Sequence, residues 1–327
     1  MISTQETKNK EARVKPVLGT MNFGPQADRE ASQAMVAHFL EQGYHEIDTA
    51  YVYNSGDSER FLGAAAQALA TNEASIATKV NPRVADVFDA AAISAQLNES
   101  LQRLGLDAVD ILYLHFPDPR TPIETTLAAC AELHAEGKFH ELGLSNFPAW
   151  QVVEIWHFCR RNGWPLPSVY QGLYNGLSRG VEAELMPALS RYSMRFYAYN
   201  PLLGGLLSGK YADFPDEPTP GRFTLRPNYR DRYWKKPFFA ALELLSAACL
   251  EQGITLVQAA YRWLVHHSAL SGTKGDGIVV GASSVVQLDQ NLQAMRQQPL
   301  PISIVEAFEA AWAAAKPECP DYFRTSV

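Results

Sequence analysis

An alternation that runs through almost the whole sequence places the tightest limit on its fold. Short runs rich in β-branched and aromatic residues are followed by longer segments with the apolar spacing of a helix. Eight such pairs with short links predict a parallel (β/α)₈ barrel of the TIM type, an α/β fold. The expected strands are 17–20, 45–48, 75–79, 109–115, 139–145, 168–171, 195–199 and 278–281. The expected helices are 28–40, 58–69, 89–104, one opened by Thr121 and Pro122, 148–161, 182–192, 238–252, 256–266 and 285–295, the last of them.

Three segments fall outside this alternation. Residues 201–237 carry six prolines and several arginines, and predict a long loop after the seventh strand with a functional role. Residues 316–327 predict a C-terminal tail over the active-site face. Residues 1–13 are polar and predict a flexible tail, so that the barrel domain would span 14–327.

Composition narrows the classes of partner. The formal net charge of -7 argues against nucleic acid or an anionic membrane as a partner. No apolar run approaches the roughly 20 residues that span a bilayer. Four separated cysteines without a signal-like N-terminus predict reduced thiols in a cytoplasmic protein. A doubly wound dinucleotide domain is the rival fold, but the glycine-rich run 275–281 precedes a strand instead of following one.

Polar residues stand where three successive expected strands stop. Asp48, Lys79 and His115 close these strands, and Tyr53 follows the first of them. Taken alone, each residue is more often a solvated loop residue or a member of a structural ion pair. Because the C-terminal ends of the strands meet at one face of a parallel barrel, we expect all four side chains to gather there.

These four side chains make a coherent group for delivering a proton. A tyrosine is a poor acid at neutral pH, and a nearby ammonium is expected to lower its pKa. Asp48 would hold Lys79 in its charged form, and His115 would orient a carbonyl oxygen. Such a group suits the reduction of an aldehyde or ketone, in which Tyr53 protonates the oxygen as hydride reaches the carbon.

Further polar residues follow the later strands. Ser145, Asn146 and Gln171 could serve as caps and turns, or as partners of a carboxamide such as nicotinamide. Tyr199 could be a core aromatic residue or a ring that stacks on a cofactor. The glycines in 200–210, with Lys210 and Arg222, form a weak anion-cradle pattern. His266 and His267 lack metal-ligand partners at suitable spacing, so no metal site is expected.

Several stretches together resemble the aldo-keto reductase superfamily over nearly the whole chain. The match looks nearest to the aflatoxin B1 aldehyde reductase family, which is also known for reducing succinic semialdehyde. The stretches that carry the resemblance are LGTM (18–21), EIDTAYVY (46–53), YLH (113–115), EGKF (136–139), LGLSN (142–146), VYQG (169–172), YN (174–175), FYAYNPL (196–202), GGLL (204–207), NYRDRYW (228–234) and ECPDYFR (318–324).

The resemblance implies an NADPH-dependent reductase with Tyr53 as proton donor and Asp48, Lys79 and His115 as its partners. It implies a small-molecule aldehyde or ketone as substrate, with semialdehydes and dialdehydes favoured, and a homodimer. The cofactor-binding residues that it implies are Ser145, Asn146, Gln171, Tyr199, Asn200, Pro201, Leu202, Gly204, Gly205, Leu206, Ser208, Lys210, Arg222, Ser283, Gln287 and Asn291. The substrate contacts that it implies are His115, Tyr229, Arg232 and Arg324.

Two departures from the family pattern leave alternatives open. Gln287 stands where many members carry an arginine that faces the 2′-phosphate of NADPH, so NADH stays open as a cofactor. The segment around Arg226 and Pro227 is shorter and stiffer than the family leads us to expect, which puts the substrate in question. The same fold also serves as an NADPH-binding regulatory subunit of channels, and as a reductase for biosynthetic, polyketide-type ketones.

Overall fold

Eight parallel strands close into one barrel in the computed structural model, which describes residues 13–85, 87–211, 214, 218 and 221–324. The strands pair in sequence order, and the last pairs with the first. The predicted barrel is therefore confirmed, and the doubly wound alternative is excluded. The strands are β1 (Lys15–Gly19), β2 (Glu46–Asp48), β3 (Ser75–Val80), β4 (Val109–Leu114), β5 (Phe139–Ser145), β6 (Pro167–Leu173), β7 (Arg195–Tyr199) and β8 (Gly277–Gly281).

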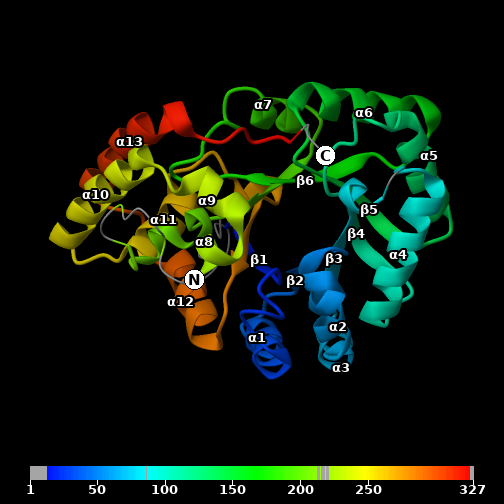
Figure 1. Ribbon diagram of the computed structural model, residues 1–327, viewed down its shortest axis with the longest axis horizontal. Coiled ribbons are helices and arrows are strands. Elements are labelled where there is room, and N and C mark those ends of the chain that lie inside the picture. The colour runs from blue at the N-terminus through cyan, green and yellow to red at the C-terminus, as the bar shows by residue number, and fades with distance from the viewer. Residues whose placement is uncertain (1–12, 86, 212–213, 215–217, 219–220, 325–327) are drawn as a thin grey trace, which may run out of the picture.

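Helices surround the barrel (Figure 1). Those that link successive strands are α1 (Arg29–Glu41), α2 (Asp57–Gly63), α3 (Ala66–Thr71), α4 (Ala90–Leu104), α5 (Ile123–Ala135), α6 (Ala149–Asn162) and α7 (Leu185–Arg191). After β7 come α8 (Arg222–Leu225), α9 (Pro227–Tyr233), α10 (Lys236–Glu251) and α11 (Leu256–His266), and after β8 come α12 (Val285–Arg296) and α13 (Ile302–Ala315). Asp89 caps α4 by accepting a hydrogen bond from the Ala92 N–H, and Gly105 ends it in the left-handed conformation, as predicted.

Three of the expected helix assignments are wrong. The segment 58–69 is not one helix, because α2 ends at Gly63 and α3 begins at Ala66. Gly63 lies so close to the end of α4 that an added Cβ would sit 2.2 Å from the Arg103 carbonyl oxygen. The helix 285–295 is not the last one, since α13 follows it and packs along α10 (Figure 1). The segment 182–192 becomes helical only at Leu185.

The long connection after β7 contains more regular structure than a loop. It holds a 3₁₀ turn at Leu203–Ser208 and the short helices α8 and α9. Gly204 has φ 68°, and an added Cβ would lie 2.5 Å from Cδ1 of Tyr229, which packs onto the turn from α9. This contact holds α9 beside the C-terminal end of β7.

Two buried clusters fill the molecule. The larger one lies between the strands and the helices, and the smaller one contains side chains from alternate positions of six strands. Tyr113 fills the space beside Gly143, where an added Cβ would meet its ring at 2.4 Å. The members of the smaller cluster are Val17, Ala77, Ile111, Tyr113, Val169, Tyr197 and Val279. A filled barrel leaves only the strand ends for a site.

The segment after α13 returns to the C-terminal ends of the strands. The Arg324 N–H donates to the Asn146 carbonyl at 2.9 Å, directly after β5, and the Tyr322 hydroxyl accepts from the Ala149 N–H at 3.1 Å. The predicted C-terminal tail over this face is thus observed as far as Arg324, while the predicted N-terminal tail lies, except for Arg13, outside the described residues. No single helix of the described chain has the length and apolar character to cross a bilayer. The bent pair α10 and α11 passes that test only when the two are joined.

Candidate active site

The four polar residues predicted from the strand ends lie together. Asp48 is the last residue of β2, Lys79 is the second-last residue of β3, and His115 directly follows β4. Tyr53 enters from the loop after β2: its ring centroid lies 5.9 Å from that of His115, and the Lys79 ammonium lies 5.1 Å from its ring centroid. The expected gathering of all four side chains is observed.

Lys79 and Asp48 form a buried ion pair beneath the tyrosine. Lys79 is fully buried and Asp48 is 2% exposed. The ammonium donates to both Asp48 carboxylate oxygens at 2.6 Å and to the Thr49 carbonyl at 2.7 Å. Gln171 adds a fourth bond by donating from Nε2 to Asp48 Oδ1 at 2.8 Å. Because each charge has its full set of partners, the pair can persist in a site without water.

Asn81 fixes the orientation of the His115 ring. Its Oδ1 accepts the Arg83 backbone N–H at 2.9 Å, so its amide nitrogen is the group that faces His115 Nδ1, 3.4 Å away. An amide nitrogen can only donate, so Nδ1 must accept and the proton of the neutral ring resides on Nε2. Burial, and then the charges of Lys79 and Arg83, hold the pKa of His115 well below its ordinary value. His115 is therefore a neutral donor.

The electrostatics of Tyr53 differ from expectation. We expected the Lys79 ammonium to lower the pKa of the phenol, but burial, followed by the charge of Asp48, raises the pKa of Tyr53 well above its ordinary value of 10.0. The carboxylate of Asp48 compensates the charge of Lys79, so the electrostatic potential that the pair produces at Tyr53 has little net positive character. Tyr53 keeps its proton over the whole physiological range.

A cavity of about 640 Å³ opens above these residues at the C-terminal face. Of the described residues along it, one is acidic, Asp48, and that carboxylate is already paired with Lys79. Its basic residues are Arg83, Lys210, Arg222, Arg226 and Arg232. A chain with a net charge of -7 thus surrounds this cavity with positive charge, which favours an anionic ligand.

Residues predicted to hold a nicotinamide line one wall. Ser145, Asn146, Gln171 and Tyr199 all face the cavity. The Asn146 amide donates to the His115 carbonyl at 3.0 Å and to Ser145 Oγ at 2.9 Å, while its oxygen accepts from the Tyr199 hydroxyl at 2.8 Å. Its backbone has φ 64°, the left-handed region that asparagine tolerates. This network fixes the wall as one unit.

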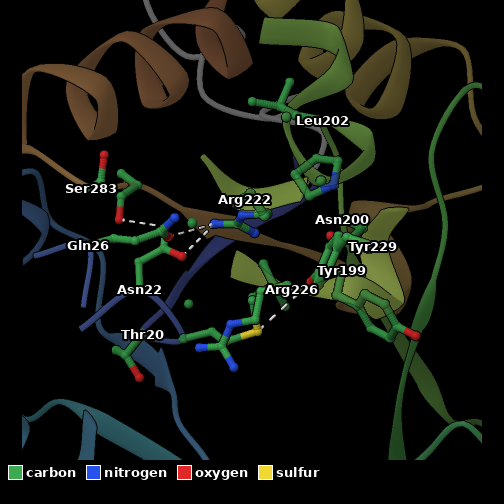
Figure 2. Close-up of a pocket in the computed structure, with 18 of the residues that line it drawn as sticks. Thr20, Asn22, Gln26, Tyr199, Asn200, Leu202, Arg222, Arg226, Tyr229 and Ser283 are labelled. Carbon is green, nitrogen blue, oxygen red and sulfur yellow. Dashed lines mark hydrogen bonds between the residues drawn. The ribbon is translucent and has the colours of Figure 1, made fainter. Parts of the chain in front are cut away.

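The predicted phosphate side lies between β7 and β8. Arg222 donates to Asn22 and Gln26, which follow β1, and Figure 2 shows its guanidinium pointing toward them with Ser283 on the same side of the cavity. The Ser208 Oγ is buried with no partner in the described part of the chain, which fits a hydrogen bond donated to a phosphate oxygen. The Ser283 N–H and hydroxyl both donate to the Gln287 side-chain oxygen, at 3.1 and 2.9 Å. The arrangement of these side chains fits a dinucleotide.

Most of the remaining predicted cofactor residues also line the cavity. They are Asn200, Pro201, Leu202, Gly204, Gly205, Lys210 and Asn291. Leu206 is the exception, because its side chain is fully buried in the core and does not reach the cavity. The sequence pattern could not separate it from Gly205 and Ser208, which lie close to it in the same turn and do line the cavity.

Most of the predicted substrate residues also line the cavity. His115, Tyr229 and Arg232 do so, whereas Arg324 is not one of the lining residues and lies beside Asn146, to which its backbone N–H donates. Sequence reasoning missed Thr20, Asn22, Asn81, Arg83 and Phe116, which also line it. All five lie at or just beyond the C-terminal ends of strands, so the rule that identified Asp48 and His115 could have found them.

This combination of features defines a class of protein. An acid with a high pKa, a neutral imidazole donor and a cavity that fits a dinucleotide, on a (β/α)₈ barrel, are the parts of a nicotinamide-dependent oxidoreductase. Among the described residues, no group of three or more His, Cys, Asp or Glu side chains is placed to hold a metal ion.

Comparison with known proteins gives the family. The sequence model of the Aldo/keto reductase family matches residues 17–313, and the chain belongs to this family. It is 48% identical over 319 residues to the aflatoxin B1 aldehyde reductase member 2 of Mus musculus, covering 94% of this chain and 87% of the relative. It is 46% identical over 324 residues to the human aldo-keto reductase family 7 member A3, covering 96% and 98%. The protein is thus an oxidoreductase.

Proposed function

We propose that the protein reduces aldehydes to alcohols with NADPH, and that Tyr53 is the proton donor. The observation that carries this proposal is the group of Tyr53 and His115 above the buried Lys79–Asp48 pair, at the floor of a positively charged cavity. The names of the relatives that are aflatoxin B1 aldehyde reductases support an aldehyde, and not a ketone, as the substrate of this protein. Semialdehydes and dialdehydes are the favoured substrates, because Arg232 and Arg324 suit a second polar end.

The side chains divide the work of one reaction. A bound nicotinamide cofactor supplies the hydride that forms the new C–H bond. His115 donates from Nε2 to the carbonyl oxygen and holds it beside the Tyr53 hydroxyl. As the C–O π bond breaks, its electron pair takes the Tyr53 proton, which solvent later replaces. The Lys79 ammonium, 5.1 Å from the centroid of the Tyr53 ring, offsets part of the charge of the phenolate that remains, while Asp48 fixes the position of Lys79.

The preference for NADPH over NADH rests on the basic residues of the phosphate side. We expect Arg222→Gln to raise the Kd for NADPH by about tenfold or more, because the substitution removes a charge-assisted contact to phosphate. Titration of cofactor fluorescence would measure this Kd. Arg29→Gln is the matched control, since Arg29 lies on α1 over the Phe61 ring, away from the cavity. An unchanged Kd in Arg222→Gln would remove Arg222 from the cofactor site.

The pKa directions predict an unusually flat pH profile. Tyr53 acts when protonated and His115 when neutral; their pKa values lie well above 10.0 and well below 6.5. With a neutral aldehyde, kcat/KM for reduction should stay constant from pH 6.5 to pH 10.0 and fall only outside this window, at low pH as His115 gains a proton and at high pH as Tyr53 ionises. A loss of activity centred near pH 8 would show that Tyr53 does not hold its proton as burial predicts.

Turnover of a small panel tests the function itself. Purified protein would be mixed with NADPH or NADH and 4-nitrobenzaldehyde, 2-carboxybenzaldehyde, succinic semialdehyde or a neutral ketone, and cofactor oxidation followed by absorbance. Rapid turnover of the carboxylated aldehydes would support the proposal. Tight NADPH binding without turnover would favour a regulatory subunit of a channel-like partner, and turnover of the ketone alone a biosynthetic reductase. The homodimer and the cytoplasmic location stay predictions.

A further inference from the structure

A second group of cations gathers at the cavity beside Arg222. It consists of Arg83, in the 3₁₀ turn Pro82–Val84 after β3, Arg232 in α9, and Arg324 beyond α13. Arg222 contacts the loop after β1, whereas Arg83 and Arg324 lie beside the loops after β4 and β5. Arg222 and Arg232 both lie in the connection after β7, with guanidinium carbons 5.4 and 5.5 Å from the centroid of the Tyr229 ring, so the group extends from Arg222 toward the loops after β4 and β5.

Arg83 is tied to the catalytic imidazole through one aromatic ring. Its guanidinium carbon lies 3.8 Å from the centroid of the Phe116 ring. Phe116 in turn stacks on His115, with centroids 4.5 Å apart and planes at 15°. Arg83 is exposed at the rim of the cavity, so it is accessible to a ligand whose carbonyl group reaches His115.

The other two arginines carry unsatisfied donors. Arg232 Nε, Arg324 Nε and Arg324 Nη2 are buried and have no hydrogen-bond partner among the residues that the structure describes. Burial and then the charges of Arg324 and Arg232 hold the pKa of Arg83 below its ordinary value, and burial and then Arg232 do the same for the pKa of Arg324. The positive charges of these arginines repel one another, and Arg232 and Arg324 also have donors without acceptors in the described chain. A bound anion would compensate the charges and accept hydrogen bonds from those donors.

We propose that Arg83, Arg232 and Arg324 bind a dianionic end group, a phosphate monoester, on the aldehyde substrate. This inference rests on the proposed function and names its substrate class. A single carboxylate brings one charge and two oxygens, which two guanidiniums satisfy. Three guanidiniums from three separate segments match the two charges and three terminal oxygens of a phosphate monoester. A dicarboxylate carries the same double charge, and a comparison of malonate with phosphate distinguishes the two.

A matched pair of substrates tests the proposal. Glyceraldehyde and glyceraldehyde 3-phosphate differ only in the phosphate, so the ratio of their kcat/KM values isolates the anion site. We expect the ratio to favour the phosphorylated aldehyde by about tenfold or more, and Arg83→Gln to lower it by about tenfold. Arg83→Lys should restore part of the ratio, because it keeps the charge without the planar donors. A ratio near one, or one that Arg83→Gln leaves unchanged, would overturn the proposal.

The control variant is Arg161→Gln. Arg161 lies 4.8 Å over the Phe158 ring on the exposed side of α6, and so copies the Arg83–Phe116 contact away from the cavity. The substrate ratio should be unchanged in this variant. A fall in Arg161→Gln equal to that in Arg83→Gln would show a general effect of charge and contradict the anion site.

Binding of simple anions gives a readout that does not need turnover. The Tm of the NADPH-saturated protein would be measured with inorganic phosphate, malonate or acetate at equal ionic strength, so that the cofactor covers its own phosphate side. Phosphate should raise Tm most, and Arg83→Gln should abolish the difference. Stronger stabilisation by malonate would mean a dicarboxylate and overturn the phosphate assignment. If neither aldehyde is reduced, the proposed function fails, while the anion result still decides the site.

Discussion

Tyr53→Phe should lower kcat for aldehyde reduction by about 10²–10⁴-fold while the Kd for NADPH changes less than about twofold. The substitution removes only the hydroxyl, so the ring keeps its contacts with His115 and Lys79. General acid catalysis typically contributes a factor of this size. Steady-state kinetics and a fluorescence titration would give the two values.

Tyr51→Phe is the natural control for that experiment. Tyr51 lies two residues earlier on the same loop, but its hydroxyl donates to Glu99 at 2.8 Å and its side chain does not line the cavity. Loss of the Tyr51 hydroxyl should leave kcat for aldehyde reduction near the wild-type value. Near wild-type turnover by Tyr53→Phe itself would sink the assignment of the proton donor.

Lys79→Met should cost about 3–5 kcal/mol in the free energy of unfolding, since it leaves the buried Asp48 carboxylate without its ammonium. Urea denaturation at neutral pH would measure the loss. The double variant Asp48→Asn/Lys79→Met should be less destabilised than the single one, because no charge is then left unpaired. A single variant as stable as the wild type would mean that Lys79 and Asp48 are both uncharged in the folded protein.

A matched substitution at the surface separates burial from charge. Lys235 pairs with Glu318 at 3.2 Å, with both side chains about a third or more exposed. Lys235→Met should change stability by no more than about 1 kcal/mol, since solvent screens exposed pairs. An equal loss in both lysine variants would show that burial of the Lys79 pair is not the cause.

The sequence was sufficient to predict the barrel and the gathering of Asp48, Lys79 and His115 at one face of it, because both follow from simple rules. Alternation of strand and helix patterns defined the architecture, and Phe139–Ser145, Arg195–Tyr199 and Leu256–His266 match the predicted bounds. Asp48 and His115 were found from their position at strand ends. The rule needs no knowledge of packing, which is why it worked before any contact was known.

The errors arise where tertiary contacts decide. The break between α2 and α3 lies where Gly63 meets the backbone of α4, a contact invisible in the local pattern. The helix α13 did have a readable pattern, since Ile304, Phe308, Ala311 and Ala315 recur at helical spacing and are buried. The pKa of Tyr53 lies in the opposite direction from the sequence prediction, because burial of the phenol has the largest influence on this pKa and is not visible in the sequence pattern.

The two ends of the cavity also belong to different stages in the assembly of the chain. The four side chains proposed to be catalytic lie between positions 48 and 115, on neighbouring strands whose pairing closes short loops and so has a low entropic cost. The phosphate end instead needs the seam between β1 and β8, where Asn22 donates to the Ala282 carbonyl across 260 positions of sequence. Contacts of such long range form slowly. During synthesis, the catalytic strands can therefore meet well before the seam closes to complete the cofactor end.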